Sequence, residues 1–67
     1  MNKPLNKKQA EHSKFVRYKE GAERYSMGLN TFMKMAKDAK ACYKFNKVVL
    51  VNCEIFEEYL ETFRLDF

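Results

Sequence analysis

YKEGAERYSMGLNTFMKMAKDA, residues 18–39, is the stretch of sequence that decides the fold. Its apolar residues form two short helical faces on either side of a turn that contains Met27. They are Ala22 and Tyr25 before the turn, and Phe32, Met35 and Ala36 after it. Neither face is wide enough to be stable alone, so we expect a helix-turn-helix in which Ala22 is the small residue at the crossing and Met27 fills the turn.

The other side of the second helix is expected to face outward. Its residues are Leu29, Asn30, Thr31, Met33, Lys34 and Lys37. In helix-turn-helix proteins that bind DNA, this side of the second helix enters the major groove. Because two of the six residues, Leu29 and Met33, lack hydrogen-bonding groups, we expect base-edge contacts to discriminate only modestly between sequences.

Strand patterns and a third helix flank this unit. We expect a short strand over residues 15–18, helices over 19–25 and 29–39, strands over 42–45 and 48–51, and a helix over 53–63. The two later strands are separated by Asn46-Lys47, which is typical of a β-hairpin, with Tyr43 and Phe45 on one face. Asn52 is expected to cap the last helix. The apolar stripe of that helix should pack inward; it comprises Ile55, Phe56, Tyr59, Leu60 and Phe63.

The length of 67 residues allows one small domain, which we place at residues 15–67 behind a flexible basic arm at residues 1–14. No apolar run is long enough to span a membrane, and the first residues lack the apolar core of a signal peptide, so we expect a cytoplasmic protein. Cys42 and Cys53 have neither the spacing of a zinc finger nor that of a disulfide framework. We therefore expect no metal and no other cofactor.

Charge is distributed unevenly along the chain. Residues 1–47 hold twelve of the thirteen Lys and Arg residues but only four of the nine acidic residues. A polyanion such as DNA would be attracted to residues 1–47 and repelled by the acidic last helix. The charge pattern would therefore also orient the protein on the polyanion. Tyr43, Lys44, Asn46 and Lys47 of the hairpin are expected to join the second helix in contacting a duplex.

The order strand, helix, turn, helix, hairpin, helix predicts an α+β winged helix-turn-helix with Asn46-Lys47 at the tip of the wing. The runs KEGAERYSMG (19–28), YKFNK (43–47) and EIFEEYL (54–60) resemble the small excisionase-like winged-helix proteins of bacterial conjugative transposons, whose fold is related to that of MerR regulators. Ser26 stands where many relatives carry Gly, so we expect its φ to be negative or slightly strained.

The resemblance implies binding of double-stranded DNA by the outward residues of the second helix and by the wing. It also implies an architectural role in excision, in which the protein bends DNA and recruits an integrase, or further copies of itself, without cutting DNA. Transcriptional regulation by the same fold is one alternative. Another is a protein-interaction adaptor that uses the acidic last helix with Tyr59, Leu65 and Phe67. No catalytic constellation or phosphate loop is present in the sequence, so we expect neither an enzyme nor a small-molecule substrate.

Overall fold

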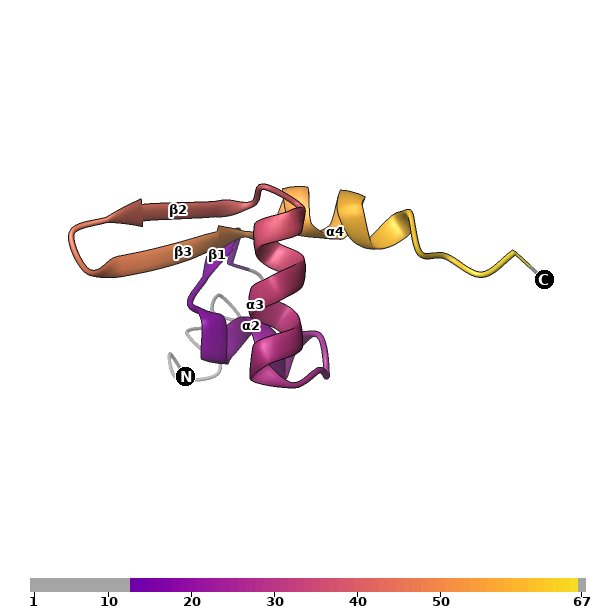
Figure 1. The fold of residues 1–67 in the computed structure, drawn as a ribbon, viewed down its shortest axis with the longest axis horizontal. Coiled ribbons are helices and arrows are strands. Elements are labelled where there is room, and N and C mark those ends of the chain that lie inside the picture. Colours follow the sequence, from indigo (N-terminus) through magenta and orange to yellow (C-terminus); the bar gives the residue numbers. More distant parts are fainter. Residues whose placement is uncertain (1–12, 67) are drawn as a thin grey trace, which may run out of the picture.

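The computed structural model describes residues 13–66, so most of the expected arm and Phe67 lie outside the described residues. Its elements follow the predicted order (Figure 1). They are β1 (Phe15–Val16), α2 (Tyr18–Arg24), α3 (Leu29–Asp38), β2 (Cys42–Phe45), β3 (Val48–Asn52) and α4 (Cys53–Glu61). The prediction of a small α+β fold with two helices, a hairpin and a last helix is confirmed. None of the helices in residues 13–66 has the length and apolar character needed to cross a membrane.

The three strands form one antiparallel sheet with β3 in the middle. On one side Val16 of β1 pairs with Val51, and on the other Tyr43 of β2 pairs with Leu50. The sheet is three-stranded only at its base, because β1 has two residues and chain direction changes where α2 begins. The β2–β3 hairpin therefore projects beyond the helices on one side, while α4 extends on the opposite side (Figure 1).

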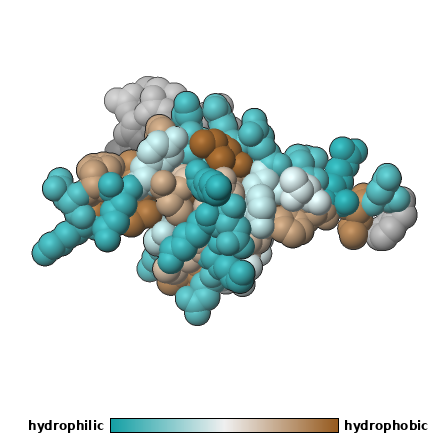
Figure 2. Space-filling model, turned by 45° about the horizontal axis from the view of Figure 1, so that its top comes forward, coloured by the Kyte–Doolittle hydropathy of each residue, from teal (hydrophilic) through white to brown (hydrophobic). Residues whose placement is uncertain are grey.

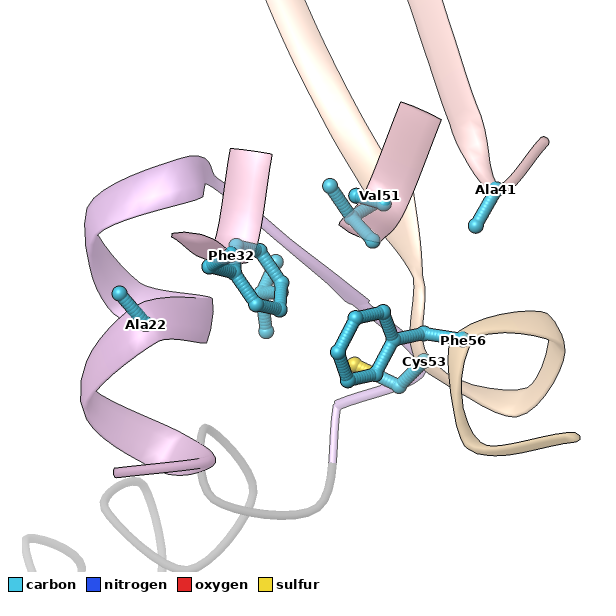
Figure 3. Packing of buried hydrophobic residues seen from close by; sticks show 8 residues of the cluster. Ala22, Phe32, Ala41, Val51, Cys53 and Phe56 are labelled. Atoms are coloured by element: carbon cyan, nitrogen blue, oxygen red, sulfur yellow. The ribbon is translucent and has the colours of Figure 1, made fainter. Parts of the chain in front are cut away.

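The core lies where α2, α3, the base of the sheet and α4 meet (Figure 3). The rings of Phe32 from α3 and Phe56 from α4 pack in a tilted arrangement with their centroids 4.8 Å apart, and both are fully buried. Tyr25 lies half-buried against both rings. Val51 of β3 is buried as well and belongs to the same core cluster as Phe32 and Phe56.

Helix α2 packs against the Phe32 ring of α3 at Gly21, which has no side chain. A Cβ atom at Gly21 would lie 2.3 Å from Cζ of Phe32, far inside van der Waals contact. The neighbouring Ala22, expected at the crossing, is also buried. The absence of a side chain at Gly21 thus allows the Phe32 ring to lie directly on α2.

Both helices of this pair end in the same way. After α2, the N–H of Ser26 donates to the carbonyl of Glu23 and that of Met27 to the carbonyl of Ala22. These two hydrogen bonds form a Schellman motif, which requires a residue in the left-handed helical conformation after the helix. Ser26 accordingly has φ 56°, a conformation that Gly adopts more readily than Ser. The alternative of a negative φ at Ser26 was therefore wrong. Lys40 plays the same part after α3, with φ 60°.

Helix α4 begins as predicted but ends earlier. The side-chain oxygen of Asn52 accepts hydrogen bonds from the N–H groups of Glu54 and Ile55, which confirms Asn52 as the N-cap. The helix ends at Glu61, and Phe63 is 55% exposed, so the prediction that Phe63 packs inward was wrong. The reason is geometric: beyond Glu61 the chain leaves the helical path and runs away from the core (Figure 1).

The two residues before β1 form hydrogen bonds with α4 and α2. The backbone carbonyl of Lys14 accepts a 2.7 Å hydrogen bond from the N–H of Cys53 at the start of α4. The carbonyl of Ser13 accepts a 2.8 Å bond from the Arg24 guanidinium. Ser13 and Lys14, which sequence reasoning assigned to the arm, thus form part of the contacts that hold α2 and α4 together.

Candidate nucleic-acid interface

The outward face of α3 carries five of the six side chains expected there. Asn30, Thr31, Lys34 and Lys37 are exposed, and Leu29 is 47% exposed. Met33 differs, since it is half-buried. One residue advances the helix by about 100°, so Met33 lies beside the buried Phe32 at the edge of the core face rather than at the centre of the outward one.

The two lysines of this face differ in their electrostatic surroundings. The ammonium group of Lys34 lies 3.5 Å from a carboxylate oxygen of Asp38, one turn further along α3. Lys37 forms no ion pair with another described residue. A phosphate approaching Lys34 would have to compete with Asp38, whereas the charge of Lys37 is available.

Tyr43 and Phe45 of the hairpin share a face, as expected, but they differ in how they are held. The ring of Tyr43 packs edge-on against Phe15 of β1, with centroids 5.5 Å apart. Its hydroxyl accepts a 3.3 Å hydrogen bond from the side-chain amide of Asn52. Phe45 is 52% exposed and lies nearer the turn. Tyr43 therefore links the base of the hairpin to Phe15 and Asn52, whereas Phe45 is the more exposed of the two aromatic side chains.

The hairpin turn consists of Asn46 and Lys47, both exposed. Asn46 has φ 55°, a left-handed conformation that Asn tolerates better than most residues, and this explains its place in a two-residue turn. Lys44 pairs directly with Val49, so it lies on the opposite face of the hairpin from Tyr43 and Phe45. Lys44 and Lys47 form no ion pair within residues 13–66. Figure 2 shows hydrophilic side chains gathered at the hairpin end and over α3.

Two cations that the sequence analysis did not assign to the site lie beside the hairpin. Arg17 precedes α2 and Lys19 is in its first turn, and both line a surface hollow together with Lys47. Sequence reasoning placed Arg17 in an alternating strand and Lys19 at the start of a helix, with no sign that either faced the hairpin. Only the fold of the chain brings residues 17–19 and 47–49 together.

The four glutamates of α4 lie at the end of the molecule opposite the hairpin tip (Figure 1). They are Glu54, Glu57, Glu58 and Glu61, and together they line a shallow groove. Glu57 accepts a 2.6 Å hydrogen bond from the hydroxyl of Tyr25. Burial and this bond raise the pKa of Tyr25, so its hydroxyl stays protonated and continues to donate. Glu57 therefore helps to hold α4 against α2.

Two other glutamates of the groove take part in exposed ion pairs. Glu54 lies 3.8 Å from the ammonium of Lys14, and Glu61 lies 3.7 Å from the guanidinium of Arg64. Within the described part of the chain, Glu58 alone of the four has neither an ion pair nor a side-chain hydrogen bond. The cations near α4 are thus matched by carboxylates, while those of the hairpin are not.

Comparison with known families places the chain. A family model described as a family of unknown function, DUF6462, matches residues 13–63. The chain belongs to the DUF6462 family. The match spans every helix and strand of this DUF6462 fold, from β1 to the end of α4. Neither the curated proteins nor the solved structures contain a match. The description of DUF6462 states no activity.

Proposed function

We propose that this DUF6462 chain is a winged helix-turn-helix protein that binds double-stranded DNA. In this proposal α3 enters the major groove, and the β2–β3 hairpin is the wing that lies on the adjacent groove or backbone. The observation that supports it best is the separation of charge. Lys37, Lys44 and Lys47 on α3 and the hairpin form no ion pair with described residues, whereas Lys14 and Arg64 near α4 do.

The separation has a direct physical consequence for a polyanion. Unpaired lysines displace condensed counterions from DNA when they reach phosphates, and this release favours binding. The glutamates of α4 lie on the far side from the hairpin tip (Figure 1), where they would not oppose the approach of the duplex. Both effects favour one orientation, with the hairpin and α3 toward DNA and α4 away from it.

Within this class we favour an excisionase-like architectural factor of a mobile element, acting in the cytoplasm. A single module of this size offers a small interface, which suits binding in several copies or together with an integrase. A transcriptional regulator would use the same surface, and the DNA itself distinguishes the two roles. An architectural factor should bend a permuted set of duplex fragments strongly, which is measured by gel mobility, and a weakly bending protein would favour regulation.

The proposal is tested with the full chain and a fluorescently labelled duplex of random sequence. If Lys37, Lys44 and Lys47 each neutralise one phosphate, the logarithm of the association constant should fall with the logarithm of the salt concentration with a slope of about −3. Fluorescence anisotropy across a salt series measures this slope. A chain that shows no binding at low salt would overturn the proposal.

A second candidate function, a protein-interaction adaptor, is favoured by the apolar side chains that follow α4. Phe63 is 55% exposed and Leu65 is 71% exposed, and both follow α4, the helix whose glutamates line the acidic groove. Tyr59 packs edge-on against Phe63 with centroids 5.1 Å apart. Such exposed apolar residues beside carboxylates are typical of surfaces that bind other proteins. An integrase or a second copy of this chain could bind there while α3 holds DNA.

The Glu58→Lys variant separates the two functions. Because Glu58 has no ion pair or side-chain hydrogen bond among the described residues, its reversal should leave the fold intact. We expect binding to a single short duplex to be unchanged or slightly stronger, since one repulsive charge is removed. Cooperative binding of further copies to a longer duplex, measured by gel shift, should weaken. Loss of single-duplex binding by the folded variant would mean that α4 faces DNA.

A further inference from the structure

A hollow of about 280 Å³ lies between the start of α2 and the hairpin. Three cationic residues line it: Arg17, which is the N-cap of α2, Lys19 in the first turn of α2, and Lys47 in the hairpin turn. None of the three forms an ion pair with another residue in 13–66. Three unpaired positive charges around one hollow repel each other, so an anion bound there would relieve an unfavourable interaction.

The same side of the hairpin adds a fourth cation. Val49, which lines the hollow, pairs directly with Lys44, so the two side chains lie on the same face of the sheet. Lys44 is exposed and also lacks an ion pair among the described residues. The face of the hairpin that looks toward α2 therefore carries positive charge up to the turn.

The remaining lining of the hollow is largely apolar. It consists of Tyr18 and Val49. The hydroxyl of Tyr18 lies 3.6 Å from Sγ of Cys42, which directs it toward the base of the hairpin. Burial, with the Cys42 contact, raises the pKa of Tyr18, so the phenol stays neutral and adds no negative charge.

We propose that this hollow binds a backbone phosphate of DNA together with its deoxyribose. The phosphate would lie among Arg17, Lys19 and Lys47, and the sugar would pack on Tyr18 and Val49. A hollow that joins three cations with Tyr18 and Val49 fits a sugar–phosphate unit, because the cations attract the phosphate and the carbon atoms of the sugar can pack on the other two residues. The inference rests on the proposed function, and it adds to the wing contact a second contact made by the start of α2.

The decisive comparison uses two double variants that remove the same charge. Arg17→Gln/Lys19→Gln removes two cations from the hollow, and Lys14→Gln/Arg64→Gln removes two cations near α4. We expect the first to flatten the salt slope of duplex binding by about one unit and to weaken binding about eightfold at about 0.1 M salt. The control should change affinity less than threefold. Circular dichroism checks that both variants fold.

Amide chemical shifts of the wild-type chain provide a test that needs no substitution. On titration with a short duplex, the amide signals of residues 17–19 and 47–49 should move together with those of α3. Thymidine monophosphate serves as a second probe, and it should move the same hollow signals only weakly, because a single nucleotide lacks the contacts of α3.

The outcomes separate this inference from the function on which it rests. If the wild type binds duplex but the Arg17/Lys19 variant behaves like its control, or the amides of the hollow stay in place, the inference is wrong and the proposed function stands. A nucleotide that moves the hollow signals more than the duplex does would also overturn it, and would point to a free nucleotide as ligand. Failure of the wild type to bind any duplex would overturn both proposals.

Discussion

The Gly21→Ala variant is expected to lose about 3 kcal/mol of its free energy of unfolding, a large share of the stability of so small a domain. The added methyl group would lie 2.3 Å from the Phe32 ring. That ring is fully buried against Phe56, so it has no free space into which it can move. The gain in helix propensity from Gly to Ala, about 1 kcal/mol, offsets only part of the strain. Urea unfolding followed by circular dichroism measures the difference.

Gly28→Ala is the matched control, because it adds the same methyl group to the other glycine of the chain. A Cβ atom at Gly28 would have no neighbour within 4 Å, and its φ of −66° suits any residue. Gly28 is the N-cap of α3, where Ala is less favourable than Gly, but Ala also reduces the entropy of the unfolded chain. We expect these effects to cancel to within about 1 kcal/mol. Equal stability of the two variants would show that α2 and α3 do not pack as closely as described.

The Lys37→Gln/Lys47→Gln variant is expected to bind duplex DNA about sixtyfold more weakly than the wild type at about 0.1 M salt. Each phosphate contact adds about 0.9 to the salt slope, which corresponds to about an eightfold gain in affinity at this concentration. The salt slope should flatten by about two units. Both side chains are exposed and without ion pairs in the described part of the chain, so their removal should leave the fold unchanged.

Lys14→Gln/Arg64→Gln again provides the comparison at equal net charge. If DNA responded only to the overall charge of the chain, both double variants would weaken binding equally. A selective loss in Lys37→Gln/Lys47→Gln would support the orientation with α3 and the hairpin toward the duplex. Equal losses, in proteins shown to be folded, would contradict that orientation.

Local patterns in the sequence were sufficient to predict the order of the elements. The i, i+3, i+4 spacing of Phe32, Met35 and Ala36 predicted the buried side of α3, and Asn46-Lys47 predicted the turn of the hairpin. Asn52 was predicted as the cap of α4, because its side chain satisfies N–H groups only two and three residues away. Each of these features depends on neighbours along the chain, which a sequence displays directly.

Features that depend on residues distant in sequence required the tertiary structure. The lack of a side chain at Gly21 matters because Phe32, eleven positions later, lies on it. Phe63 is exposed because α4 ends at Glu61, although the spacing of Phe63 in the sequence continues the apolar stripe of that helix. Arg17 and Lys19 join Lys47 in one hollow only because β1 pairs beside β3 and returns the chain beneath the hairpin. Periodicity shows which side of an element is apolar, whereas the packing of elements decides which charges and rings meet.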